Sequence, residues 1–242
     1  EAHFADQFVT SRELEWDAET RSVRGALRVQ LGAITMREQS FQPDAQEKAA
    51  ATLTAVRAAG LGILPWGRAA EQLRQRIAFL HTLDGEWPDV SDGALLARLD
   101  EWLAPELAGT ELPMIDLARS LEHLLSWKQR ASIDEVAPTH MNVPSGSRIP
   151  IDYTDPAAPA LAVRLQEVFG WKETPRIGGD RVPLVMHLLS PAQRPVQATR
   201  DLASFWRSGY FDVKKDLKGR YPKHYWPDDP LTATATRRVR PR

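Results

Sequence analysis

The spacing of apolar residues changes twice along the chain, and these changes restrict the folds that it can adopt. Near the N-terminus, residues 23–31 alternate apolar and polar side chains, which is the period of a strand with one buried face. A turn-like segment at 17–20 separates this strand from an earlier one at 13–17, and Gly32 shifts the alternation, which predicts a bulge or bend. Because an isolated hairpin is only marginally stable, we expect these strands to complete a sheet whose other strands precede this chain.

The middle of the chain, residues 43–136, has helical spacing and is predicted to form a helical bundle. Asp44 is placed to begin the first helix and Gly60 to end it. Three further helices are expected, of which the second is capped by Ser91 and the third begins near Pro113. The residues expected to face the core are Ala49, Leu53, Val56, Leu73, Ile77, Leu80, Leu95, Leu99, Trp102, Leu103, Leu117, Leu121, Leu124 and Leu125. In the helix expected directly after Gly67, the side chains expected to face outward are Arg68, Arg74 and Arg76.

The rest of the chain mixes short strands with helices, so the fold class predicted for the whole is α+β. The strands are expected at 139–143, 148–153, 182–189 and 195–198 and would form a small antiparallel sheet with flanking helices. The apolar spacing from Leu161 to Phe169 predicts one helix. From Thr199 the spacing is helical again, with one apolar seam formed by Leu202, Phe205, Trp206, Val213 and Leu217.

Composition excludes several classes of protein. The chain has 0 cysteines, which excludes disulfides and thiolate zinc sites and fits a cytoplasmic setting. It has no apolar run of about 18 residues, so no membrane partner is expected. The net charge of −1 is unevenly spread, because residues 199–242 hold 11 Lys and Arg against 5 Asp and Glu. A basic end on an otherwise acidic chain indicates either a polyanionic partner or a solvated tail.

No catalytic residue, cofactor site or metal site is predicted within this chain. The glycine-containing segments at 144–147 and 177–180 lack the Lys and Ser/Thr that complete a phosphate-binding loop, and a hairpin turn is the simpler interpretation of each. The 6 histidines show no pairing at metal-ligand spacing. The adjacent Asp228 and Asp229 lie between prolines, where a turn is favoured over a cation site. Enzyme activity of the chain by itself is therefore not expected.

The basic end contains the candidate binding residues. If 199–223 formed one helix, a basic stripe within about 40° would lie opposite the apolar seam and could contact phosphates. Cations and aromatic residues then interleave at 220–226, and such aromatics can stack on unpaired bases. The candidate nucleic-acid-binding residues are Arg200, Arg207, Lys214, Lys218, Arg220, Lys223 and Trp226. The alternatives are a solvated stripe, aromatic residues that close the fold, and a break at Gly209 that would scatter the stripe.

Several short segments, in the same order along the chain, resemble the C-terminal region of the HrpB family. The members of this family are bacterial ATP-dependent helicases of the DEAH/DExH-box class. The runs that carry the resemblance are His187–Ala192, Arg194-Pro195, Thr199–Leu202, Phe205-Trp206, Lys218–His224 and Trp226–Pro230, with Pro144–Arg148 and Val163–Glu167. The series is dense from about Pro138 to Pro230 and looser before it. A long ordered series of this kind is far more specific than any single motif above.

The resemblance implies two RecA-like motor domains, a winged helix, a helical bundle and most of an OB-like module before this chain. Residues 1–42 would then end the OB-like module, 43–137 form a helical bundle and 138–230 form the family's α+β domain. Composition, rather than the resemblance, predicts that residues 231–242 form a basic flexible tail, because they are rich in Thr, Ala and Arg. ATP and Mg would bind only in the absent motor domains, because none of the family's ATP-binding motifs matches here.

The function expected on this basis is that of an accessory region of an RNA helicase. Its partners would be the upstream domains of the same polypeptide and single-stranded RNA. The alternative is a protein-docking module that regulates the motor or recruits an unidentified protein. That module would use as its anchors Trp66, Trp87, Trp171 and Trp226.

Overall fold

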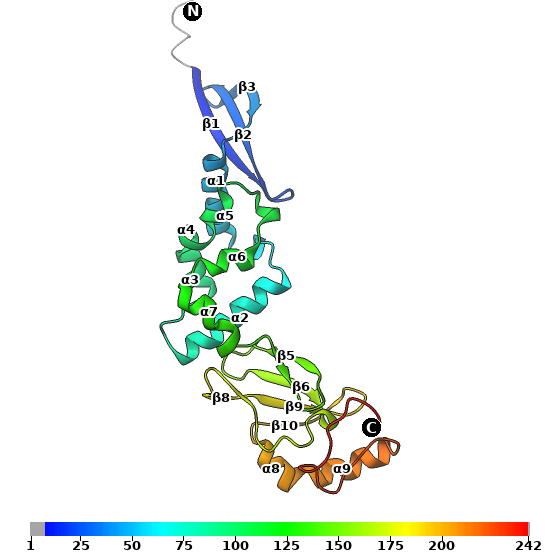
Figure 1. Ribbon diagram of the computed structural model, residues 1–242. Coiled ribbons are helices and arrows are strands. Elements are labelled where there is room, and N and C mark those ends of the chain that lie inside the picture. Colours follow the sequence, from blue (N-terminus) through cyan, green and yellow to red (C-terminus); the bar gives the residue numbers. More distant parts are fainter. Residues whose placement is uncertain (1–7, 242) are drawn as a thin grey trace, which may run out of the picture. The chain divides into compact units, whose positions relative to one another are not determined.

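The structure, a computed structural model, describes residues 8–241, and the chain divides into two compact units (Figure 1). The first unit comprises the chain up to Arg74 together with Pro88–Ser126. The second comprises Gln75–Trp87 and the chain from Trp127 onward. The division falls inside helix α2 (Arg68–Leu83), so the helical region predicted at 43–137 contributes to both units.

The first unit begins with an antiparallel three-stranded sheet of β1 (Phe8–Asp17), β2 (Ser22–Leu31) and β3 (Ile34–Phe41), in that order. The prediction of a bulge or bend at Gly32 is wrong. Gly32 has a φ of 58° and lies in a turn that reverses the chain, so that β3 pairs antiparallel with β2. The register shift in β2 lies earlier, between Val29 and Gln30. At Gly25 an added Cβ would lie 2.6 Å from the Phe41 ring, so this strand position requires glycine.

The helices of the first unit begin as predicted in two cases and differ from the prediction in a third. They are α1 (Ala45–Ala59), the 3-10 helix η2 (Leu61–Ile63), α3 (Asp92–Ala97), α4 (Leu99–Trp102), α5 (Ala104–Leu107), η3 (Leu112–Met114) and α6 (Leu117–Glu122). Asp44 caps α1 in a reciprocal pair with Glu47, and Ser91 caps α3, as predicted. The helix predicted near Pro113 starts at Leu117 instead, because Asp116 accepts hydrogen bonds from the first free amides.

The predicted core residues of the helices are confirmed with one exception. Thirteen of the fourteen apolar residues expected to face inward are 9 % exposed or less, whereas Ala49 is half-buried. Leu95, Leu99 and Trp102 nevertheless lie in two short helices rather than one, since the helix ends at Arg98, whose φ of −113° and ψ of 22° are not helical. Residues 8–241 contain no helix that is both long and apolar enough to cross a membrane.

The second half of α2 packs in the second unit against α7 (Trp127–Val136), and Arg76 is buried there. Its predicted outward position is wrong: the side chain is 6 % exposed and donates to the carbonyl oxygens of Ile133 and Ala137 and to Asp134. Ile133 lies in the last turn of α7, where its carbonyl also accepts from the amide of Ala137, and Ala137 directly follows the helix. A guanidinium at this C-terminal end of the helix adds a donor to these carbonyls and interacts favourably with the helix dipole. Helical spacing within α2 predicts a solvent-facing cation here, but the partners of Arg76 come from another helix.

The second unit is organised around a five-stranded sheet in the order β10-β9-β6-β5-β4. Its strands are β4 (His140–Asn142), β5 (Arg148–Asp152), β6 (Ala160–Arg164), β9 (Val185–Leu189) and β10 (Pro195–Thr199), with β7 (Arg176–Ile177) and β8 (Val182–Pro183) as a separate hairpin. The pair β6 and β9 is parallel, while the other neighbours are antiparallel. The sheet is therefore mixed rather than purely antiparallel.

The helix predicted at Leu161–Phe169 is wrong. Leu161 and Val163 belong to β6, and the 3-10 helix η4 (Leu165–Glu167) follows directly. All four residues that suggested helical spacing are buried, so the pattern correctly marked the core but not the secondary structure. Parallel pairing with β9 decides the conformation of β6, and this partner lies more than 20 residues away in the sequence.

Candidate nucleic-acid interface

The segment that carries the candidate binding residues is broken into two helices, α8 (Leu202–Arg207) and α9 (Gly209–Arg220). Ser208 separates them with a φ of −131° and a ψ of −63°. Asp201 is the N-cap of α8, and its carboxylate accepts from the amide of Ser204. The single continuous stripe predicted for Arg200, Arg207, Lys214 and Lys218 therefore does not form.

The apolar side of these helices forms the core of this part of the second unit. Four residues of the predicted seam, Leu202, Phe205, Trp206 and Leu217, are buried, whereas the fifth, Val213, is half-buried. The ring of Phe169 lies 6.1 Å from the rings of both Trp206 and Tyr210, and 6.2 Å from Tyr225. Two hydrogen bonds fix α8, one from the amide of Leu202 to Thr174 Oγ1 (2.8 Å) and one from Trp206 Nε1 to the carbonyl of Trp171 (2.7 Å).

Two of the candidate cations are held by acids. Lys214 Nζ lies 2.5 Å from Asp228 Oδ1, and its hydrogen bond, aided by the charge of Lys218, keeps the pKa of Asp228 below the ordinary value. Arg220 lies 3.6 Å from Asp216, one turn earlier in α9. The structure thus does not present the predicted cations equally to solvent.

The other cations of the set are exposed, whereas the aromatic member is not. Within residues 8–241, no ion pair involves any of the exposed side chains Arg200, Arg207, Lys218 and Lys223. Trp226 is 9 % exposed, and its indole N–H donates to the carbonyl of Tyr221 (2.9 Å). Its ring is packed inside the unit, which favours a role in closing the fold over stacking on RNA bases.

Residues 231–241, expected as a flexible tail, are hydrogen-bonded to the second unit. The amide of Thr236 donates to the carbonyl of Gln166 (2.9 Å), and the amide of Tyr225 donates to the carbonyl of Val239 (2.9 Å). Gln166 Nε2 in turn donates to the carbonyl of Tyr225 (3.0 Å). The predicted turn at Asp229 begins this segment, since its carboxylate accepts from the amide of Leu231 and the hydroxyl of Thr232. We call residues 231–241 the C-terminal strap.

The strap carries two exposed arginines, Arg237 and Arg238, which are not among the binding residues predicted from the sequence. The sequence indicates them only through the net charge of the basic end. They border a shallow hollow of about 190 Å³, together with Ser145 and Thr234. The position of the strap depends on the backbone of Gln166, about 70 residues earlier, and no local pattern in the sequence indicates that pairing.

A buried carboxylate supports the loop beside this hollow. Glu167 is 3 % exposed and accepts from Ser145 Oγ (2.8 Å) and Arg164 Nε (2.8 Å). Burial raises the pKa of Glu167, but the hydrogen bonds from Ser147, Ser145 and Arg164 outweigh it, and the net effect lowers the pKa below its ordinary value. The carboxylate is therefore ionised at neutral pH and is balanced by Arg164.

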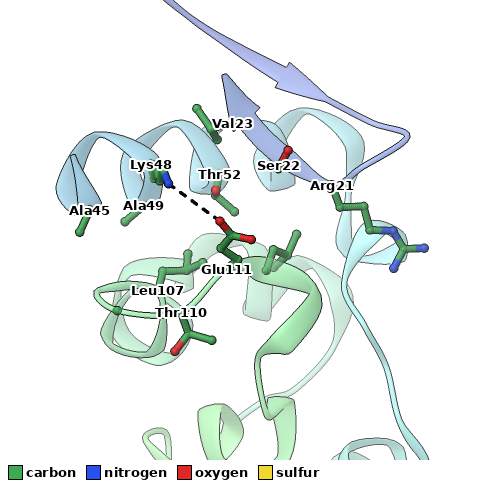
Figure 2. Close-up of a pocket in the computed structure, with 12 residues that line it drawn as sticks. Arg21, Ser22, Val23, Ala45, Lys48, Ala49, Thr52, Leu107, Thr110 and Glu111 are labelled. Carbon is green, nitrogen blue, oxygen red and sulfur yellow. Dashed lines mark ion pairs between the residues drawn. The ribbon is translucent and has the colours of Figure 1, made fainter. Parts of the chain in front are cut away.

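The first unit contains a larger cavity of about 280 Å³, shown in Figure 2. It lies between the β1–β2 turn, one side of α1 and the segment 107–112. Its polar groups have both signs, because Lys48 Nζ lies 3.9 Å from Glu111 Oε1 and Arg21 lines the same space. Because both cations and an acid line this cavity, its charge does not favour the binding of a polyanion.

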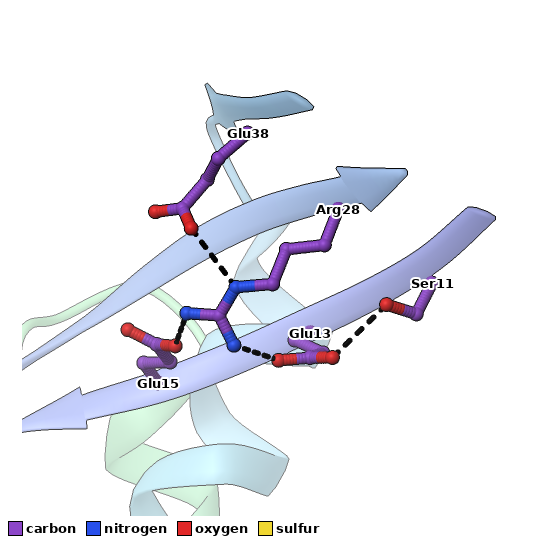
Figure 3. Close-up of polar contacts among 5 residues, drawn as sticks. All are labelled: Ser11, Glu13, Glu15, Arg28 and Glu38. Carbon is purple, nitrogen blue, oxygen red and sulfur yellow. Dashed lines mark hydrogen bonds and ion pairs between the residues drawn. The ribbon is translucent and has the colours of Figure 1, made fainter. Parts of the chain in front are cut away.

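The sheet of the first unit holds one arginine among three carboxylates (Figure 3). Arg28 on β2 contacts Glu13 and Glu15 of β1, and its Nε lies 3.0 Å from Glu38 of β3. These hydrogen bonds raise the pKa of Arg28 above its ordinary value, and the hydrogen bond to Glu38 has the largest effect. Within residues 8–241, no cluster of histidine and acidic residues has the geometry of a metal site.

Comparison with known proteins identifies the class to which this fold belongs. Residues 99–230 match the model of the family HrpB_C, described as ATP-dependent helicase C-terminal. The chain therefore belongs to this family of helicase C-terminal regions, and the resemblance seen in the sequence is confirmed.

Individual relatives agree with this assignment. The chain is 44 % identical to the ATP-dependent RNA helicase HrpB of Escherichia coli (strain K12) over 237 residues, which is 95 % of this chain and 29 % of that protein. The crystal structure of the E. coli DExH-box NTPase HrpB matches with a TM-score of 0.79 at 43 % identity, over 96 % of this chain and 30 % of that one. A second structure, of the E. coli DEAH/RHA helicase HrpB, matches with a TM-score of 0.68 at 41 % identity, over 91 % and 29 %. The chain thus spans about three tenths of these relatives.

Proposed function

We propose that this chain is a non-motor accessory region of a cytoplasmic ATP-dependent RNA helicase, and that it binds single-stranded RNA and positions it for the motor domains. The motor domains, with their ATP and Mg, would lie in the remaining seven tenths of a protein the length of its relatives. A phosphate backbone is attracted by cations that remain in solvent, because their binding releases condensed counterions.

The observation that carries this proposal is the exposure of the positive charge in the second unit. Residues 199–242 have 11 Lys and Arg against 5 Asp and Glu, and Arg200, Arg207, Lys218 and Lys223 are exposed. In the part of the chain that the structure describes, no acid lies within ion-pair distance of these four. Their charge is available to a polyanion, while Lys214 and Arg220 would contribute less.

The test measures the binding of the whole chain to a fluorescein-labelled single-stranded RNA by fluorescence anisotropy at several salt concentrations. We expect binding that weakens with salt, with a log–log slope near −0.7 for each phosphate neutralised. The double variant Arg207→Glu/Lys218→Glu should lose at least tenfold in affinity. A matched control is Arg37→Glu/Arg68→Glu, which reverses two exposed arginines of the first unit that form no ion pair among the described residues. An absence of salt-dependent binding by the wild type at low ionic strength would contradict the proposal.

The alternative, a protein-docking module, has less support from the tryptophans that would anchor it. Trp87 and Trp226 are each 9 % exposed, and Trp66 and Trp171 are half-buried. Trp66 also donates its indole N–H to the carbonyl of Leu61 (2.9 Å). Docking anchors would need to be exposed and to form one apolar patch, so RNA binding is the function that we put forward.

A further inference from the structure

We propose that the hollow beside the C-terminal strap is a phosphate site in which Arg237 and Arg238 bind one phosphodiester group of the RNA backbone. This inference rests on the proposed function and deepens it, because it names a point of RNA binding outside helices α8 and α9. Three properties of the hollow support it: the charges that line it, the way the strap is held, and the groups beneath it.

The charges that line the hollow have one sign. Its border consists of Ser145, Thr234, Thr236, Arg237, Arg238 and the adjoining backbone, and no acidic residue is part of it among residues 8–241. The larger cavity of the first unit differs, since Lys48 there lies 3.9 Å from Glu111. Two guanidinium groups at one hollow can each offer a planar pair of N–H donors, which is the geometry that matches phosphate oxygens.

The strap is fixed before any ligand binds. Thr236 is 7 % exposed, its amide donates to the carbonyl of Gln166 (2.9 Å), and its Oγ1 accepts from the amide of Arg238 (3.0 Å). The backbone that carries both arginines is therefore held on each side of Arg237. A free tail would lose backbone entropy on binding, whereas a docked strap has already lost it on folding.

The groups beneath the hollow leave the arginines as its main donors. The hydroxyl of Ser145 donates to Glu167, so Ser145 presents lone pairs rather than a proton to the hollow. The charge of Glu167 is itself balanced by Arg164 Nε at 2.8 Å. The positive potential above the loop thus comes from Arg237 and Arg238, and Thr234 has an exposed hydroxyl that can donate as well.

The shape of the hollow favours an extended chain over a small free ion. It is shallow and borders exposed residues, so a phosphate bound here remains accessible and can continue into neighbouring nucleotides. Arg240 Nε donates to the carbonyl of Lys223 (3.3 Å), which joins the strap to the segment carrying another exposed cation. Lys223 and Arg240 are both exposed, so this hydrogen bond joins two further cations to the strap that carries Arg237 and Arg238.

The test compares the wild type with three variants of the whole chain in the RNA-binding measurement described above. In Arg237→Glu/Arg238→Glu we expect an affinity at least tenfold lower at low salt, and a log–log salt slope smaller by about 0.7, because one phosphate fewer is neutralised. Arg237→Lys/Arg238→Lys keeps the charge but removes the guanidinium fork, so its slope should stay close to the wild-type value while its affinity falls severalfold. The control Arg37→Glu/Arg68→Glu carries the same change of net charge in the first unit. Hydrogen exchange of the amides of Tyr225 and Thr236, which donate across the contact between the strap and the rest of the unit, verifies that the strap is still docked in each variant.

The outcomes separate this inference from the proposed function. If the wild type does not bind RNA, both are overturned. If the wild type binds, and Arg237→Glu/Arg238→Glu keeps the wild-type affinity and slope, only the phosphate site is overturned. A titration with inorganic phosphate, followed by the NMR signals of the arginine Nε–H groups, tests the other source of the same chemistry. Signals that move with millimolar phosphate, in a chain whose RNA affinity does not depend on these arginines, would identify a site for free phosphate instead.

Discussion

The two units contain sheets that are covered to very different degrees. In the second unit, Leu161, Met186 and Leu188 on adjacent strands are 0 % exposed. In the first unit, Ile34 and Met36 on β3 are 64 % and 57 % exposed. Apolar side chains of the second unit's sheet are buried within that unit, whereas large apolar groups on the edge strand of the first remain exposed in this chain. Only the second unit is therefore expected to be strongly stabilised by its sheet.

The same contrast holds for arginine–glutamate pairs. Arg28 has three glutamates, but two of these, Glu15 and Glu38, have side chains more than half exposed, so solvent screens the pairs (Figure 3). Arg164 has one glutamate, and the side chain of Glu167 is 4 % exposed. Exposed pairs contribute little to folding, while an ionised carboxylate that is buried depends on every hydrogen bond it receives. Burial, rather than the number of partners, should decide the energetic effect.

The largest expected effect comes from the aromatic cluster of the second unit. Phe169→Ala removes a ring that is 1 % exposed and packs near three other aromatic rings, and should lower the free energy of unfolding of this unit by about 4 kcal/mol. Ile34→Ala in the first unit should cost less than about 0.5 kcal/mol, because its side chain is largely in solvent. Hydrogen exchange under native conditions, read separately for each unit, measures both. Equal costs for the two substitutions would remove the contrast between the sheets.

A smaller effect is expected at the β7–β8 turn, where the hairpin lies against α2. Gly178 has a φ of 68°, and an added Cβ would lie 2.5 Å from Leu83 Cδ1 and 3.1 Å from the ring of Phe79, which is fully buried. Gly178→Ala should therefore cost about 2 to 3 kcal/mol, through both backbone strain and the clash. Gly179 has a φ of 67° and Gly32 of the first unit a φ of 58°, and at both positions the space around an added Cβ is open.

These two glycines serve as controls for the clash. Gly179→Ala and Gly32→Ala should each cost about 1 kcal/mol, which is the strain alone. Urea denaturation of the three variants gives the comparison. If Gly178→Ala proved no more costly than Gly179→Ala, the hairpin would not be packed tightly against α2, and the core of the second unit would be looser than its geometry indicates.

The sequence was sufficient wherever neighbouring residues decide the conformation. Asp44 with Glu47 forms the predicted helix start because a capping pair needs only residues three apart, and Gly60 ends the same helix. Most of the apolar residues of the helices are buried as predicted, since helical spacing places them on one side, and only Ala49 and Val213 are half-buried. Resemblance to a known family supplied the class of protein, which no single motif in the chain could have given.

The sequence was insufficient where a distant partner decides. Arg76 is buried because the end of α7 offers it carbonyl oxygens about 60 residues later in the chain. Leu161 lies in a strand because β9 pairs with it, although its spacing to Leu165 resembles that of a helix. The C-terminal strap docks because Gln166 accepts a hydrogen bond from Thr236, and composition alone predicted a free tail. The hollow with Arg237 and Arg238 follows from that docking, and so could not be derived from charge counts.

The smallest of the expected effects depends on pH and compares the two arginine–glutamate environments directly. The pKa of Glu167 in the folded chain lies below the ordinary value of 4.5, so its ionised form stabilises the fold above that pH, and this contribution is lost as the pH falls through the folded pKa. Glu167→Gln should lower the stability of the second unit by about 1.5 kcal/mol at pH 7, with a difference that shrinks toward pH 3. Glu38→Gln in the first unit should leave stability nearly unchanged at both pH values, because that carboxylate is half exposed. Urea midpoints at pH 7 and pH 3 test this, and a cost of Glu167→Gln that did not vary with pH would mean that its packing, rather than its charge, holds the loop at Ser145.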